Sequence, residues 1–147
     1  MAVRALQSSD AVAARALVER HLGGTRYHPR TCEQLELALV ARHGEDAGLA
    51  LGDMSGVLLY GTVAGAAGVV RIHTAIGNGL ASLLEGMLAS EPARSARLVV
   101  CELASDVIFA PLLHALLTFG FLRGGTVEDY FEHGVSLEIL VLYRHTS

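Results

Sequence analysis

The stretch HTAIGNGLASLL, residues 73–84, indicates the fold class. An apolar run ending in Ile72 precedes it, and Gly77 and Gly79 lie one residue apart within it. From Leu80 onward, apolar residues recur at helical spacing, which predicts an amphipathic helix over residues 80–89. A strand, a glycine turn and a helix therefore follow one another. Free N–H groups at such a helix start suit an anion such as pyrophosphate. Glycine can equally serve the geometry of the turn alone.

The remaining sequence patterns predict a mixed α/β fold. A capping box at Thr31–Gln34 marks the start of the second helix, and His28-Pro29 indicates a loop before it. We expect one mostly antiparallel sheet of about seven strands, flanked by helices, in a single domain over residues 1–147. The predicted elements are strand 3–6, helices 10–21 and 31–42, strands 48–51, 57–63 and 68–74, helix 80–89, strand 97–101, helix 110–119, and strands 126–131 and 137–143.

Composition excludes several classes of protein. The chain of 147 residues is 52% hydrophobic and 18% charged, which argues against disorder. Its net charge of −4 carries no basic stripe, which argues against nucleic acid as a partner. Cys32 and Cys101 are isolated, so we expect reduced thiols in a cytoplasmic protein and no metal site.

A membrane span is also disfavoured by the sequence. The uncharged run 54–70 is interrupted by four glycines, which favours buried hairpin strands over a spanning helix. Residues 1–10 lack the long apolar core of a signal peptide.

Two architectures place a pyrophosphate at a glycine turn of this kind. The first is the dinucleotide-binding fold, because Gly77-x-Gly79-x-x-Ser82 is close to its glycine signature, and Glu102 follows roughly 20 residues on, where a ribose-binding acid belongs. Against it, the signature follows a three-strand meander, and too little chain remains after Glu102 for further strand–helix units. An NAD-dependent oxidoreductase is therefore the third choice of function.

The second architecture agrees with nearly the whole chain. Residues 74–79, TAIGNG, resemble the motif (Gln/Arg)-x-x-Gly-x-(Gly/Ala) of the GNAT N-acetyltransferase family, and the predicted order of elements is similar to that family's. The ending, a helix followed by Gly120-Phe121 and a closing hairpin, also resembles it.

The resemblance implies a binding site for acetyl-CoA. The strand near 70–74 would separate from the strand near 98–101, and the pantetheine arm would lie in the split. A backbone N–H near Ile72 would polarise the thioester carbonyl. Thr74 occupies the Gln/Arg position of the motif. The pyrophosphate would bind the backbone of Ile76, Gly77, Asn78, Gly79, Leu80 and Ala81.

The residues for proton transfer are less clear from the sequence. His73 and Glu102 are candidate bases beside the split, although each can be purely structural. The resemblance leads us to expect a tyrosine acid in the last helix where this chain has Leu116, and often an asparagine where it has Phe109. His114 is expected to point away from the site.

The resemblance implies transfer of an acetyl group from acetyl-CoA to a primary amine, on a small molecule or a peptide. The acidic residues Glu128, Asp129 and Glu132 either line the amine site or form a solvated hairpin. A catalytically weak or inactive acyl-CoA-binding or sensing protein is the alternative, because Leu116 cannot donate a proton. We also expect a homodimer, since the strand 137–143 is apolar on both faces.

Overall fold

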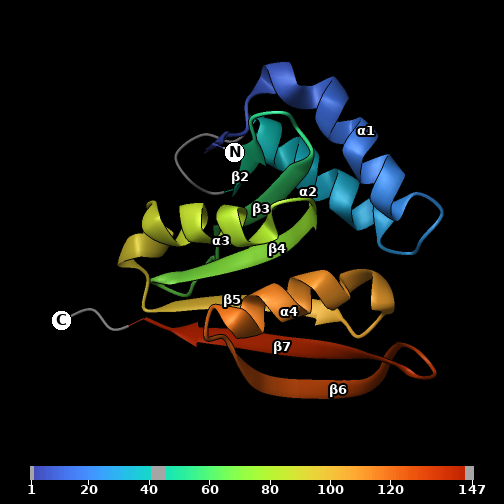
Figure 1. Ribbon diagram of the computed structural model, residues 1–147. Coiled ribbons are helices and arrows are strands. Elements are labelled where there is room, and N and C mark those ends of the chain that lie inside the picture. Colours follow the sequence, from blue (N-terminus) through green and yellow to red (C-terminus); the bar gives the residue numbers. More distant parts are fainter. Residues whose placement is uncertain (1, 41–45, 145–147) are drawn as a thin grey trace.

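The computed structural model describes residues 2–40 and 46–144 and contains one seven-stranded sheet with the strand order β1-β2-β3-β4-β5-β7-β6 (Figure 1). Neighbouring strands are antiparallel except for β4 and β5. The helices and strands, in chain order, are β1 (Val3–Ala5), η1 (Ser8–Asp10), α1 (Ala11–Leu22), α2 (His28–Val40), β2 (Asp46–Leu51), β3 (Gly56–Thr62), β4 (Val69–Gly77), α3 (Leu80–Ala89), η2 (Ala93–Ser95), β5 (Leu98–Ala104), η3 (Val107–Phe109), α4 (Ala110–Thr118), β6 (Leu122–Glu132) and β7 (Val135–Tyr143).

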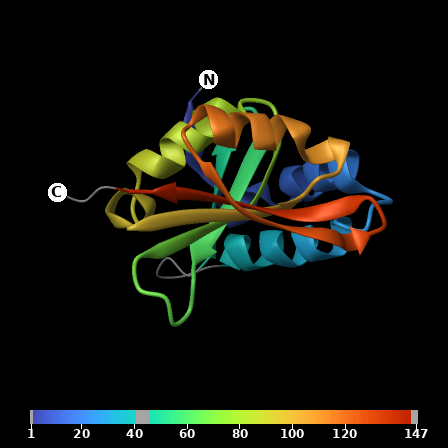
Figure 2. The same cartoon turned by 90° about the horizontal axis from the view of Figure 1, so that it is seen from below.

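Helices cover both faces of the sheet. In Figure 2, α3 and α4 lie above the sheet and α2 lies below it. α3 packs on β2 and β3 and against α4, whereas α2 packs on the same two strands and against α1. The predicted mixed α/β sheet is confirmed. A sheet with a single parallel pair also rules out the doubly wound parallel sheet of the dinucleotide-binding fold.

The core is one continuous apolar cluster on both sides of the sheet. Each layer contributes fully buried aliphatic side chains, because the predicted helices place apolar residues at helical spacing on one face. The helices above the sheet supply Leu83, Leu84, Met87, Leu112 and Leu116, and those below it supply Leu17, Leu22 and Leu35.

The predicted start of the second helix is wrong. The helix α2 begins at His28, so Pro29 lies in its first turn, where a missing N–H costs no hydrogen bond. Thr31 is buried inside α2, and its N–H donates to the carbonyl oxygen of Tyr27 at 3.1 Å. The predicted end of this helix, near residue 42, lies outside the described residues.

Several strands extend beyond their predicted ends, β4 and β6 among them. β4 extends to Gly77, so the first glycine ends the strand, and only Asn78 and Gly79 connect it to α3. β6 begins at Leu122, and its pairing with β7 is interrupted by two irregularities. The turn at His133-Gly134 joins β6 to β7, as predicted.

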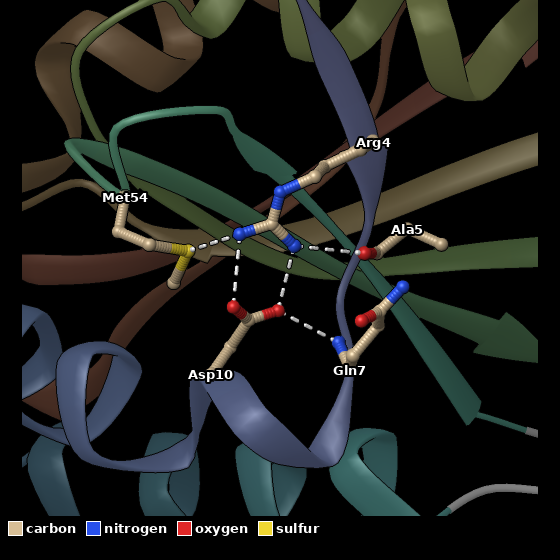
Figure 3. A network of polar contacts seen from close by, with 5 residues as sticks. All are labelled: Arg4, Ala5, Gln7, Asp10 and Met54. Atoms are coloured by element: carbon tan, nitrogen blue, oxygen red, sulfur yellow. Dashed lines mark hydrogen bonds and ion pairs between the residues drawn. The ribbon is translucent and has the colours of Figure 1, made fainter.

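An ion pair holds the first strand against the rest of the fold (Figure 3). Arg4 donates to both carboxylate oxygens of Asp10, at 2.7 and 2.8 Å, and one of these oxygens also accepts the N–H of Gln7 at 2.8 Å. The Arg4 guanidinium and the Gln7 N–H lower the pKa of Asp10 to about 2. The guanidinium nitrogen that donates to Oδ1 of Asp10 also lies 3.5 Å from the sulfur of Met54, in the turn before β3. The network therefore joins β1, the start of α1 and the β2–β3 turn.

Candidate active site

The strands β4 and β5 pair over only part of their length. Val69–Ile72 pairs in parallel with Leu98–Cys101, and the pairing ends there. Beyond this point β4 continues on β3 and β5 continues on β7, so the two strands diverge toward the right of Figure 1. The predicted split between these strands is confirmed.

A β-bulge at His73 lies where the split begins. Leu59 of β3 is opposite Thr74 and Tyr60 is opposite Ile72, so His73 is the extra residue of β4. A bulge bends its strand and redirects the local side chains. His73 and Thr74, although adjacent, both line the same cavity.

This cavity, which we call the fork cavity, has a volume of about 370 Å³. On the side of the sheet it is lined by His73 and Thr74 from β4 and by Glu102 from β5, and its other polar lining residues are Arg26, Arg30, Thr31 and Gln34. The opposite side comes from the loop before α2, from α2 itself, from the segment that begins α4, and from β6. The cavity therefore brings together segments from four parts of the sequence at the point where the sheet divides.

His73 has a carboxylate partner. Its Nε2 lies 3.0 Å from Oδ1 of Asp46 on β2, and its side chain is 15% exposed. The bond fixes the imidazole ring and leaves Nδ1 free of Asp46. A carboxylate on one ring nitrogen is a common way to orient a histidine that accepts a proton at the other. The sequence analysis did not find Asp46, which is 27 residues away along the chain.

Two other groups of the fork cavity lack a protein partner. Glu102 is exposed, is the one acidic residue in the cavity lining, and forms no ion pair with any residue that the structure describes. Thr74 is 5% exposed, and its Oγ1 has no hydrogen-bond partner among the described residues. A buried hydroxyl without a partner costs about 1–3 kcal/mol, so this position suits a polar atom of a ligand.

The glycine turn is different, because protein atoms already fill it. Gly77 and Gly79 have φ angles of +88° and +65°, which other residues rarely adopt. A Cβ at Gly77 would overlap the carbonyl oxygen of Ser55, and one at Gly79 would lie 2.7 Å from Cδ1 of Leu51. The N–H of Asn78 donates to the Ser55 carbonyl at 2.8 Å. Both glycines thus have a packing role, and the Asn78 amide is not free for an anion.

The start of α3 remains available to an anion. Gly79 is its N-cap residue, with no side chain that caps the first turn. Leu80 and Ala81 are the first helical residues, and Ala81 and the following Ser82 are exposed. Their N–H groups lie at the positive end of the helix dipole. Of the predicted backbone donors, Leu80 and Ala81 therefore keep the best geometry for a pyrophosphate, while Ile76 lies in the part of β4 that pairs with β3.

Ile72 and Thr74 lie at the split. Ile72 is the last residue of β4 that pairs with β5 and is 1% exposed. The first β4 residues beyond the pairing are His73 and Thr74. Thr74 lines the fork cavity.

The last helix contains no acid in the expected place. Leu116 is fully buried in the core, and His114 on the same helix is exposed. Phe109 lines the fork cavity and packs edge-on against Tyr27, with 4.8 Å between ring centroids.

Burial raises the pKa of the Cys101 thiol to about 12, so this thiol stays protonated.

The acidic residues of the hairpin do not line the fork cavity. Glu132 binds Arg26 at 2.6 Å, and Asp129 accepts the N–H of Gly134 at 2.8 Å. Their neighbours Tyr130 and Phe131 line it instead. Sequence reasoning missed these aromatic side chains because it weighed only the charges of the segment.

The described residues contain no group of three or more acidic, histidine or cysteine side chains arranged to hold a metal ion. Across residues 2–40 and 46–144, each helix falls short of the length and hydropathy that a membrane crossing requires.

Known structures share this fold. The chain superposes on a protein assigned to the GNAT family of acetyltransferases from Desulfovibrio desulfuricans with a TM-score of 0.78 and 21% identity, covering 97% of this chain and 98% of that one. For the aminoglycoside 6'-acetyltransferase type Ii the TM-score is 0.80 at 11% identity, with 100% and 99% of the chains covered. For the ribosomal-protein-S18-alanine N-acetyltransferase from Escherichia coli it is 0.73 at 13% identity, with 99% and 95% covered.

Sequence comparison alone finds no such relationship: no protein-family model matches the chain, and no curated protein matches it significantly. The superpositions extend over nearly the full length of each chain. The chain therefore has the fold of the GNAT acetyltransferases.

Proposed function

We propose that the protein is an N-acetyltransferase that transfers the acetyl group of acetyl-CoA to a primary amine. The observation that carries this proposal is the fork cavity, where the divided sheet meets an oriented histidine, a free carboxylate and a buried hydroxyl without a partner. The acetyltransferases that share the fold support the same class of reaction.

The proposed reaction forms a bond between the amine nitrogen and the acetyl carbon and breaks the carbon–sulfur bond of the thioester, so that CoA leaves as a thiolate and takes a proton from water. Acetyl-CoA, when bound, supplies that thioester. The amine must lose a proton to become nucleophilic, and His73 is the group best oriented to take it, because Asp46 holds its other ring nitrogen. Asp46 is thus a positioning residue.

Thr74 and Glu102 have separate roles in the proposal. The Thr74 hydroxyl is a donor for the acetyl carbonyl oxygen, on which negative charge develops during the reaction. Glu102 attracts the protonated amine into the cavity before it reacts. The start of α3, at Leu80 and Ala81, is the proposed pyrophosphate site.

Binding of acetyl-CoA tests the cofactor site. Acetyl-CoA should bind with micromolar affinity in calorimetry, and Ala81→Glu should weaken binding about tenfold, because the new carboxylate repels the pyrophosphate. Ala89→Glu at the exposed end of α3 is the matched control and should bind as the wild type does. No binding of acetyl-CoA by the folded wild-type protein would defeat the proposal.

A second function has one observation in its favour. Leu116 is fully buried where the resembling family has a tyrosine acid, so the protein can bind acyl-CoA without efficient turnover. An acyl-CoA-binding or sensing protein is therefore our second candidate. Tight acetyl-CoA binding with no acetyl transfer to any amine would favour it.

We also propose a homodimer that uses the C-terminal hairpin. β7 lies inside the sheet between β5 and β6, so the free edge belongs to β6 instead. On β6, Leu122 and Val127 are 61% and 44% exposed, which favours contact with a second chain. The expected mass in light scattering is that of two chains, and a single-chain mass at high micromolar concentration would contradict the dimer.

A further inference from the structure

Aromatic side chains are concentrated at the fork cavity. Of the four tyrosines and four phenylalanines in the chain, two of each line it: Tyr27, Phe109, Tyr130 and Phe131. We call these four the aromatic cluster. Their rings pack edge to face, with centroid distances of 4.8 Å for Tyr27–Phe109, 5.5 Å for Tyr27–Phe131 and 4.9 Å for Tyr130–Phe131.

The aromatic cluster is held in place by polar contacts outside it. The hydroxyl of Tyr27 donates to Asp106 at 3.2 Å, and burial is the main cause of the raised pKa of this phenol. Arg26 donates to the carbonyl oxygen of Phe131 and binds the adjacent Glu132 at 2.6 Å. The loop before α2 is thus bound to β6, and the rings form a preformed wall.

Among the charged side chains that line the cavity, Glu102 alone lacks an ion-pair partner in the described part of the chain. Arg26 is paired with Glu132, and Arg30 is paired with Glu33 at 3.2 Å. His73 is bonded to Asp46. Glu102 has no ion-pair partner among the described residues.

From these contacts we infer that the acceptor is a small monoamine with an aromatic body. Its ammonium group pairs with Glu102, and its ring packs against the aromatic cluster, whose π-faces also favour a nearby cation. This inference rests on the proposed function, since it takes the fork cavity as the acceptor site.

The same features disfavour other amines. A polycation needs several carboxylates, whereas this lining holds one, together with two arginines. Those hydroxyl groups of a polyhydroxylated amine that pack against the aromatic cluster would lack hydrogen bonds, which costs free energy. A cavity of about 370 Å³ is at the small end of ligand sites, which favours a compact molecule.

Binding measurements can test the inference apart from catalysis. We would titrate 2-phenylethylamine, 2-phenylethanol, spermidine, kanamycin and a tripeptide with an N-terminal alanine into the CoA-bound protein by calorimetry. 2-Phenylethylamine should bind most tightly, and 2-phenylethanol, which has nearly the same shape without the charge, should bind about tenfold more weakly.

Two variants test the roles of Glu102 and of the aromatic cluster separately. Glu102→Gln should weaken binding of 2-phenylethylamine about tenfold and leave 2-phenylethanol unchanged, because only the amine is charged. Glu128→Gln, at an exposed carboxylate on β6 that does not line the cavity, is its control. Tyr130→Ala should weaken both compounds about threefold to tenfold, and Tyr143→Ala, at a residue of similar exposure outside the lining, should not.

The outcomes separate the two proposals. Tighter binding of spermidine, kanamycin or the peptide, a Glu102→Gln variant that binds 2-phenylethylamine as the wild type does, or no binding of any probe would overturn the inference while acetyl-CoA binding stands. Failure of the wild-type protein to bind acetyl-CoA or CoA would defeat the proposed function itself.

Discussion

The glycine turn and the fork cavity, the two ends of the predicted site, differ in how far other protein atoms fill their space and bond their polar groups. At the glycine turn, protein atoms occupy the space beside Gly77 and Gly79, and the Asn78 amide already has a partner. In the fork cavity, the Thr74 hydroxyl and the Glu102 carboxylate lack protein partners among the described residues. Satisfied groups contribute to stability, whereas unsatisfied ones are available to a ligand. We therefore expect substitutions at the turn to change mainly folding, and substitutions in the cavity to change mainly activity.

The largest expected effect is at the turn. Gly77→Val places a β-branched side chain at a φ of +88° and against the Ser55 carbonyl, so it should cost more than about 3 kcal/mol or prevent folding. Urea denaturation followed by circular dichroism measures the loss. If close packing did not matter at this position, only the backbone strain of about 1–2 kcal/mol would be lost.

Gly134 provides the control for backbone strain alone. Its φ is +85°, but a Cβ there meets nothing within 4 Å. Gly134→Ala should therefore cost only about 1–2 kcal/mol, the strain of the left-handed conformation. Equal losses in the two variants would show that close packing at Gly77 is unimportant.

The next largest effect is on the rate of transfer. His73→Gln keeps a polar side chain beside Asp46 but cannot accept the proton, so kcat should fall about 100-fold while acetyl-CoA affinity stays within twofold. His114→Gln, on the exposed face of α4, is the matched control and should retain full activity. An unchanged kcat in His73→Gln would remove His73 from the chemistry and assign it a structural role.

Most of the fold was predictable because its signals are local. Helical spacing marked α3 and α4, and glycine turns separated the strands, so these elements follow from patterns within short windows. The split between β4 and β5 was implied by the family resemblance and not by a local pattern. The start of α2 was mispredicted because two local signals conflict. The capping box places the start at Thr31, whereas Pro29 also fits the first turn of a helix that begins earlier. The burial of Thr31 in the folded chain decides for the earlier start.

The site was harder to predict because its contacts are not local. Asp46 reaches His73 from a different strand, and Tyr27 meets Phe109 and Phe131 only in the folded chain. The glycine motif was equally ambiguous, because close packing and phosphate binding both require glycine. Only the position of Ser55, which contacts the turn, separates the two requirements.

The smallest expected effect on stability is at Thr74. A substitution there is the sharpest test of the difference between the glycine turn and the fork cavity. Thr74→Val has nearly the same shape and removes a buried hydroxyl that has no partner, so stability should stay within about 1 kcal/mol or rise. In the proposed reaction the same hydroxyl stabilises the carbonyl oxygen, so kcat should fall at least about tenfold with little change in acetyl-CoA affinity. Thr74→Ser keeps the hydroxyl and should recover much of the rate. A valine variant that is less stable yet fully active would mean that the hydroxyl serves the fold, and the comparison between the turn and the cavity would then fail at its central residue.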